Sequence, residues 1–270
     1  MKLCFNAGPE PIEEYFPFAR ENGFPWMELS CNNPKNFLPT FNAERISNIK
    51  MLRDKYHLRY GLHSASYVNS AEIEPTVRKA VEQHLLDYVE LAHQLEAEYL
   101  VLHFGYHFSL FLDEVFRCLI QTFTPVVQLA EKYDIPIGIE NMNKIHEDAE
   151  IVYLGVTIEE LSKVFQALPT KYLGLTFDVA HASLLPGGPE SFIEAFPDKI
   201  VSSHISDNDL YLDRHLPVGE GKIDFRRVLE LLKGIGFKGT LNIELPRSNE
   251  DRLLSKGRLE PILNELGIKS

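Results

Sequence analysis

The stretch Thr176-Phe177-Asp178-Val179-Ala180-His181-Ala182 completes a short apolar run that begins at Tyr172. The run predicts a buried strand, and the pair Gly187-Gly188 predicts that the turn or short helix after it soon ends. Asp178 lies at the carboxyl end of this strand and His181 follows three residues later, so both side chains can reach the same opening at that end of the strand. A carboxylate and an imidazole are ligands of metals such as zinc and manganese. Taken alone, the pair is better explained as a helix-capping Asp beside a surface His.

Short apolar runs of the same kind recur along the chain and alternate with helical patterns. The expected strands are 2–6, 26–30, 58–63, 99–105, 135–140, 173–179, 200–206 and 240–245. Helix signals lie between them, as at Asn42, Pro75 and the capping box Thr157–Glu160. This alternation over 270 residues, without a long linker, predicts an α/β protein with one (β/α)8 TIM-barrel domain over 1–270. A doubly wound open sheet is the alternative.

The expected strands three to eight all end in a residue that can bind a metal. These residues are His63, His103, Glu140, Asp178, His204 and Glu244. The residue two positions before each is mostly small or polar, and the residue between is mostly apolar. Because side chains alternate along a strand, the ligand types face the narrow lumen and converge on the carboxyl-end mouth. If about one position in five carried such a residue by composition, six matched positions would be very unlikely by chance.

A second segment adds candidate ligands after the seventh strand. Asp213 and His215 flank Arg214, and both could chelate together with His181. Gly219 and Gly221 favour a loop folded tightly over the mouth, although a polar surface loop is the alternative. Arg214 is a candidate substrate-binding residue, because a guanidinium suits an anionic or hydroxylated ligand.

The net charge, the cysteines and the apolar runs of the sequence indicate which classes of protein the chain can belong to. The net charge of -12 lacks the strongly basic footprint of a nucleic-acid-binding protein, although a local basic patch or bound cations could offset this in one cleft. Three separated cysteines favour free thiols in a reducing cytoplasm. No run approaches the roughly 20 apolar residues of a membrane span, and the start does not resemble a signal peptide. No nucleotide-binding motif occurs. The oligomeric state stays open, a homo-oligomer included.

The ligand pattern resembles the superfamily of xylose-isomerase-like TIM barrels, AP endonuclease family 2. The superfamily contains endonuclease IV and many sugar-phosphate isomerases and epimerases, which the stretch 215–224, His-Leu-Pro-Val-Gly-Glu-Gly-Lys-Ile-Asp, also resembles. Endonuclease IV binds up to three zinc ions with nine side chains. The resemblance implies that the matching ligands here are His63, His103, Glu140, Asp178, His181, His204, Asp213, His215 and Glu244. By the same resemblance, Glu140 bridges two of the ions, and His181, Asp213 and His215 hold the third.

Sugar isomerases and epimerases of the superfamily use a smaller site, which resembles Glu140, Asp178, His204 and Glu244 with one Mn²⁺, Mg²⁺, Co²⁺ or Zn²⁺ ion. We favour this function, with a sugar or sugar phosphate as substrate and with Glu140 and Glu244 moving the proton as base and acid. It leaves His63 and His103 without a role.

The alternative is a tri-zinc phosphodiesterase acting on abasic DNA or another phosphoester. The chain departs from endonuclease IV in two places. At the amino end, Cys4 to Pro11 replaces a His-x-Ser and paired-Gly pattern. In addition, Ser66 occupies the position at which that enzyme has a DNA-contacting tyrosine. A third alternative is a non-catalytic metal-binding barrel.

Overall fold

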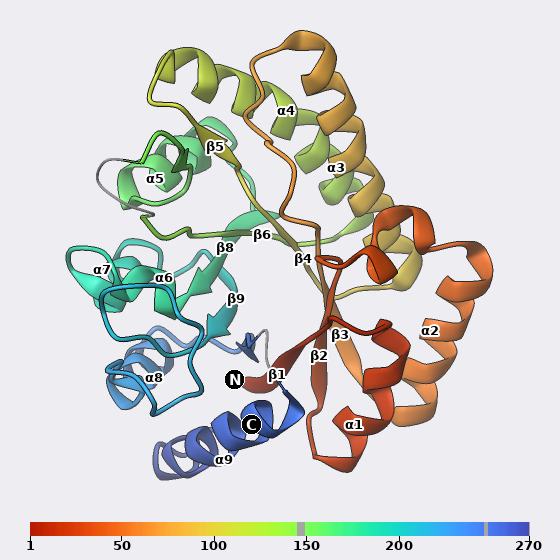
Figure 1. Cartoon of the computed structure of the whole chain (residues 1–270), viewed down its shortest axis with the longest axis vertical. Coiled ribbons are helices and arrows are strands. Elements are labelled where there is room, and N and C mark those ends of the chain that lie inside the picture. Colours follow the sequence, from red (N-terminus) through yellow and green to blue (C-terminus); the bar gives the residue numbers. More distant parts are fainter. Residues whose placement is uncertain (145–148, 246–247, 270) are drawn as a thin grey trace.

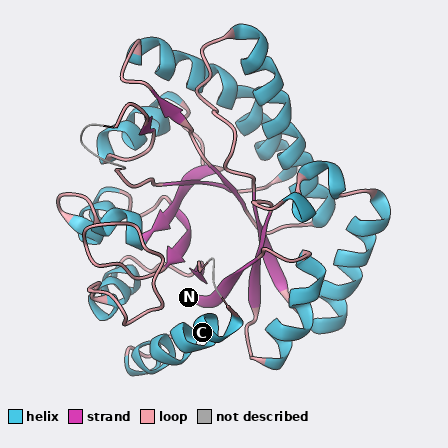
Figure 2. Cartoon of the chain, viewed as in Figure 1, coloured by secondary structure: helices cyan, strands magenta, loops and turns pink. Residues whose placement is uncertain are grey.

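The computed structural model of the chain describes residues 1–144, 149–245 and 248–269. Within these residues, eight parallel strands form a closed barrel that is surrounded by helices (Figures 1 and 2). Their order around the barrel is β1-β10-β9-β8-β6-β4-β3-β2. Their bounds are β1 Lys2–Ala7, β2 Trp26–Ser30, β3 Arg59–His63, β4 Leu100–Leu102, β6 Ile137–Glu140, β8 Leu173–Asp178, β9 Ile200–Ile205 and β10 Thr240–Ile243.

Closure of the sheet confirms the predicted barrel and excludes the open sheet. Strand β1 pairs in parallel with β10, the last strand of the chain, and on its other edge with β2. A doubly wound sheet would leave two unpaired edges. The expected strand positions are confirmed to within one or two residues, except that β4 is shorter at its carboxyl end, so that His103 follows the strand directly.

Helices follow the strands, and a small outer sheet was not expected from the sequence. The helices are α1 Tyr15–Glu21, α2 Ala43–Tyr56, α3 Pro75–Leu95, α4 Leu112–Tyr133, α5 Ile158–Ala167, α6 Val179–Ser183, α7 Gly188–Ala195, α8 Phe225–Gly234 and α9 Asn249–Glu265, with short 3-10 turns at Ile12–Glu14, Pro34–Asn36 and Leu38–Thr40. Strands β5, Tyr106–His107, and β7, Val152–Tyr153, pair antiparallel outside the barrel. None of the described helices is long and apolar enough to cross a membrane.

Capping signals in the sequence act as expected at the helix starts. The Asn42 side chain accepts a hydrogen bond from the backbone N–H of Arg45 at the start of α2. Thr157 and Glu160 form a reciprocal capping box at the start of α5. Each cap satisfies backbone donors that the first helical turn leaves unpaired.

The barrel wall separates an apolar outer layer from a polar lumen. Leu62, Ile139 and Phe177 lie between the strands and the helices and are fully buried. Inside, small residues make room for larger neighbours: a Cβ on Gly61 would lie 2.2 Å from the Tyr99 ring, and one on Gly138 would lie 2.1 Å from Thr176 Oγ1. This is the alternation of outward and inward side chains that the sequence predicts. It places the inward-facing residues at the strand ends around the opening at the carboxyl end of the barrel.

Candidate metal centre

Asp178 shows how one strand end serves both the fold and the site. Its Oδ1 accepts a hydrogen bond of 2.7 Å from the backbone N–H of His181 and so caps α6. Its Oδ2 is buried without a hydrogen-bond partner. The helix-capping interpretation is therefore correct for one oxygen of Asp178, but the expectation of a surface His is wrong, because His181 is buried.

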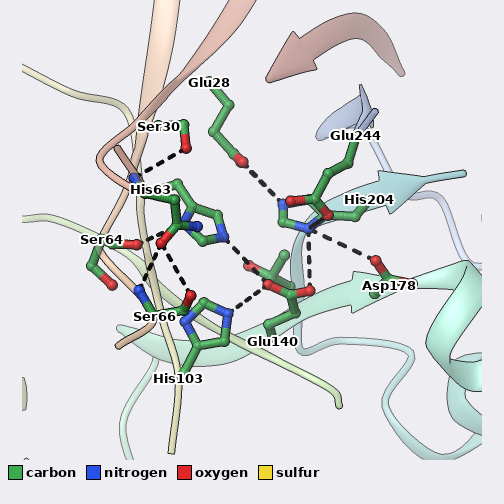
Figure 3. Close-up of polar contacts among 12 residues, drawn as sticks. Glu28, Ser30, His63, Ser64, Ser66, His103, Glu140, Asp178, His204 and Glu244 are labelled. Carbon is green, nitrogen blue, oxygen red and sulfur yellow. Dashed lines mark hydrogen bonds and ion pairs between the residues drawn. The ribbon is translucent and has the colours of Figure 1, made fainter. Parts of the chain in front are cut away.

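Four of the predicted ligands form one group, Glu140, Asp178, His204 and Glu244, which we call the central cluster (Figure 3). One ligand atom from each lies within 4.8 Å of all the others. His204 Nδ1 lies 2.9 Å from Glu244 Oε2 and 3.5 Å from Glu140 Oε1.

Three atoms of the central cluster lack hydrogen bonds although they are buried. They are Asp178 Oδ2, His204 Nδ1 and Glu244 Oε2. The last two approach each other closely, but their geometry is not that of a hydrogen bond. Buried polar atoms without partners are costly, and their convergence on a common point is what a shared divalent cation requires. The donor set therefore fits a metal ion.

A second group joins His63 and His103 to the same carboxylate. The Nε2 atoms of His63 and His103 lie 3.4 Å and 2.9 Å from Glu140 Oε2. His63 Nδ1 faces the backbone carbonyl oxygen of Ser64 at 2.8 Å. A carbonyl can only accept, so Nδ1 carries the proton, and in the neutral ring Nε2 keeps a lone pair. Glu140 thus connects this histidine pair to the central cluster.

The third group, His181, Asp213 and His215, lies beside the other two. Asp213 Oδ2 is 3.1 Å from His181 Nε2 and 3.2 Å from His215 Nε2, whereas its Oδ1 is buried and unpartnered. Both rings again direct Nδ1 at a backbone carbonyl oxygen, that of Asn141 for His181 and that of Glu244 for His215. All nine predicted ligands therefore lie in three adjoining groups.

The loop after β9 is folded back over the mouth, as the two glycines predicted. Gly219 has a φ of +81°, and a Cβ on Gly221 would lie 2.2 Å from the backbone oxygen of Asn208. The buried Asp207 carboxylate accepts hydrogen bonds from four backbone N–H groups of this loop. This anchor holds Asp213 and His215 against His181. The guanidinium of Arg214 pairs with Asp209 and does not line the cavity, so its contact with a substrate stays a prediction.

Seven of the nine predicted ligands, all except Asp178 and His204, line a cavity of about 490 Å³ at the carboxyl end of the barrel. Glu140, Glu244 and Asp213 contribute carboxylates to its wall, and Tyr153 and Tyr211 contribute aromatic surface. A smaller cavity of about 250 Å³ adjoins it and shares Asn32, His215 and Glu244. A larger cavity of about 1120 Å³ lies at the opposite, amino end, and it contains none of the predicted ligands. Sites in this fold lie at the carboxyl end, so the smaller cavities mark the candidate active site.

Opposite charges in the site shift the pKa values of its members. Burial alone would lower the pKa of His63, but the hydrogen bond to Glu140 and the charges of Glu28, Glu140 and Glu244 together raise the pKa to about 8. Asp213 likewise raises the pKa of His215 to about 9 against the effect of burial. Burial raises the pKa of Asp178 to about 6. Burial would also raise the pKa of Glu244, but the charge and hydrogen bond of His204, together with the charge of His215, lower it to about 2. Without an ion, imidazolium groups therefore balance the carboxylates, and a bound cation would take over this role.

Glu28 belongs to the site but was missed by the sequence analysis. It lies in β2, is fully buried, and places Oε1 3.0 Å from His204 Nε2. The comparison of strand ends began at the third strand and considered only final residues. The available signal was a carboxylate inside a buried strand, in register with the inward-facing Gly61.

Comparisons with known proteins agree with the fold. A family model described as "Xylose isomerase-like TIM barrel" matches residues 16–263. A solved structure of a D-tagatose 3-epimerase-like protein is 32% identical, with a TM-score of 0.89 over 99% of this chain and 98% of that one. An uncharacterized protein of Methanocaldococcus jannaschii is 33% identical over 94% of this chain and 86% of its own length.

More distant relatives include a named enzyme and a zinc-containing structure. Fructoselysine 3-epimerase of Escherichia coli O157:H7 is 24% identical over 93% of this chain and 92% of its own length. The IolI protein, whose solved structure holds a zinc atom, is 19% identical, with a TM-score of 0.79 over 98% of this chain and 99% of its own. Further similar solved structures include several sugar epimerases, which are 12–16% identical to this chain.

Proposed function

The chain belongs to the xylose isomerase-like TIM barrel family, and we propose that it is a divalent-metal-dependent epimerase or isomerase of a sugar or sugar phosphate. The observation that carries this proposal is the convergence of Glu140, Asp178, His204 and Glu244 on one point beside the mouth cavity, which Glu140 and Glu244 line. Sugar epimerases among its relatives and structural neighbours support the reaction class.

The central cluster is the proposed site of the metal ion, which can be Mn²⁺, Mg²⁺, Co²⁺ or Zn²⁺. Three carboxylates and one imidazole suit these ions, and the unpartnered atoms of Asp178, His204 and Glu244 support their role as ligands. When bound, such an ion polarises a substrate carbonyl and acidifies the adjacent carbon.

Glu140 and Glu244 are the proposed proton carriers. Both line the cavity, and both approach His204 Nδ1. In epimerisation one carboxylate takes the proton from the carbon beside the carbonyl, and the other, in its acid form, returns a proton on the opposite face. His103 Nε2 lies 2.9 Å from Glu140 Oε2, so this imidazole can exchange protons with Glu140. The epimerase proposal thereby also gives His103 a role.

The test is exchange of substrate hydrogen with solvent. We incubate the protein, loaded with Mn²⁺, with a panel of ketoses and ketose phosphates in D₂O and follow epimer formation and deuterium incorporation by NMR. General acid–base catalysis contributes about 10²–10⁴-fold, so Glu140→Gln should lose at least about 100-fold in both readouts. The exposed Glu159 on α5 offers a matched control, since Glu159→Gln should retain wild-type rates. Full turnover by Glu140→Gln would refute the assignment.

Phosphoester hydrolysis is the second candidate, because the other two ligand groups favour it. His63 with His103, and His181 with Asp213 and His215, complete three adjoining metal-binding groups with the central cluster. Several metals could activate a water and stabilise the leaving oxygen. About three zinc ions per chain by elemental analysis, together with cleavage of an abasic-site duplex, would favour this candidate. Metal uptake without turnover in either assay would favour a non-catalytic barrel.

A further inference from the structure

Glu28 occupies the barrel lumen next to the central cluster (Figure 3). Its side chain is fully buried, with Oε1 3.0 Å from His204 Nε2 and 2.8 Å from Asn242 Nδ2. Its Oε2 accepts a hydrogen bond of 3.0 Å from the Tyr99 hydroxyl. The carboxylate is therefore held from three sides by groups of three different strands or strand ends, and its position is well defined.

The charge of Glu28 is balanced by histidine side chains. Among the residues that the structure describes, its single ion-pair partner is His204, and no Lys or Arg reaches it. A buried carboxylate is costly to keep unless it is paired and hydrogen-bonded. Tyr99 and Asn242 supply hydrogen bonds, and positive charge comes from the imidazoles of His204 and His63, which form one group with Glu28. Of the two rings only His204 lies within ion-pair distance, so it is the contact that links Glu28 to the central cluster.

His204 faces Glu28 with one ring nitrogen and the central cluster with the other. Its Nε2 lies towards Glu28, and its unpartnered Nδ1 lies 2.9 Å from Glu244 Oε2. This is the reverse of His63, His181 and His215, which direct Nδ1 at backbone carbonyl oxygens. The two ring nitrogens of a metal-binding histidine have separate tasks, since the hydrogen bond of one decides which tautomer the ring adopts.

We propose that Glu28 is a positioning residue of the metal centre. It accepts the Nε2–H of His204 and so holds the ring with the Nδ1 lone pair directed at the point that Glu140, Asp178 and Glu244 share. The inference rests on the metal-binding part of the proposed function and does not depend on the substrate. Tyr99 and Asn242 keep the carboxylate in place while a cation occupies the cluster.

The first experiment uses the wild-type protein loaded with Zn²⁺ and labelled with ¹⁵N-histidine. Long-range ¹H–¹⁵N NMR spectra distinguish the two ring nitrogens of His204. We expect a protonated, hydrogen-bonded Nε2 and a metal-bound Nδ1. A His204 ring that binds zinc through Nε2, with its proton on Nδ1, would overturn the proposal. This measurement needs no variant and therefore stands even if a substitution in the lumen prevents folding.

The second experiment measures Co²⁺ affinity from the visible d–d absorption of the bound ion. Loss of an outer partner of a ligating histidine typically weakens metal affinity about 10–100-fold, and we expect this loss for Glu28→Gln. The matched control is Tyr99→Phe, which removes a hydrogen bond to the same carboxylate but leaves the contact with His204. It should change the affinity far less. Circular dichroism of the metal-free proteins checks that each variant is folded.

A double-mutant cycle separates action through His204 from a general effect of charge or packing. If Glu28 acts through His204, Glu28→Gln should weaken Co²⁺ binding in the wild-type background but add little to His204→Gln. Additive losses would overturn the proposal, as would unchanged affinity of Glu28→Gln. Loss of a whole bound ion per chain would also overturn it, because Glu28 would then be a ligand itself. Absence of turnover on every ketose would refute the proposed function but leave these readouts unaffected.

Discussion

Replacement of Asp207 by asparagine should destabilise the protein, because the amide can accept only half of the backbone hydrogen bonds that the carboxylate accepts. Asp207 is fully buried, and each of its carboxylate oxygens accepts two backbone N–H groups. Oδ1 accepts from Asn208 and Ile223 at 2.9 Å and 3.1 Å, and Oδ2 accepts from Gly219 and Gly221 at 2.9 Å and 3.0 Å. An amide keeps one oxygen, and in either orientation its NH₂ group faces two N–H donors.

The expected loss follows from the two donors that remain without an acceptor. An unsatisfied buried donor costs about 1–3 kcal/mol, so Asp207→Asn should lower the free energy of unfolding by about 2–6 kcal/mol. We expect the lower half of this range, because Gly219 is exposed and water can reach that part of the loop. The loop should also loosen its hold on Asp213 and His215.

Urea unfolding, followed by circular dichroism and extrapolated to water, measures this difference. Asp224→Asn is the matched control. Asp224 caps α8 by accepting a hydrogen bond from the N–H of Arg227, and Asn is an equally good N-cap. The control should stay close to wild type. A change of less than about 1 kcal/mol for Asp207→Asn, below the cost of one unsatisfied donor, would refute this reasoning.

Two further predictions concern protons and packing. The raised pKa values of His63, about 8, and of His215, about 9, mean that these rings hold protons at neutral pH without an ion. Zn²⁺ binding should therefore release protons, and its affinity should fall as the pH is lowered from about 9 to about 6. Calorimetry in two buffers of different ionisation enthalpy measures the proton release, and its absence at about pH 7 would contradict this prediction. Gly61→Ala places a Cβ 2.2 Å from the Tyr99 ring and should destabilise by about 1–3 kcal/mol or more. Gly257 is the matched control, because it lies on the exposed face of α9 and a Cβ there would have no atom within 4 Å. Gly257→Ala should stabilise the protein by about 0.5–1 kcal/mol. Equal melting temperatures of the two variants would contradict the packing argument.

Much of the fold was predictable because its signals are local. Asn42, Pro75 and the Thr157–Glu160 box mark helix starts through contacts within one turn, and the structure confirms all three. The small sheet of β5 and β7 was not predictable, because it joins two-residue segments more than 40 positions apart. Such short pairings depend on where the barrel loops lie rather than on a pattern within either segment.

The candidate site was predictable in its members but not in its geometry. Alternation along strands identified the inward-facing ends, and the nine predicted ligands do adjoin. The same reasoning missed Glu28, because a carboxylate in the middle of a strand has no distinguishing local pattern. It also could not show that Asp178 divides its two oxygens between a helix cap and the central cluster.

Local sequence patterns were enough to predict the eight strands, which face of each strand is buried, and the types of ligand atoms at the strand ends. These properties follow from the two-residue period of a strand and from contacts between near neighbours. Only the tertiary structure decided which ligand atoms meet, which nitrogen of His204 faces the cluster, and that Asp207 brings Asp213 and His215 to the mouth. Those distances depend on closure of the barrel, which joins β1 to β10 across almost the whole chain.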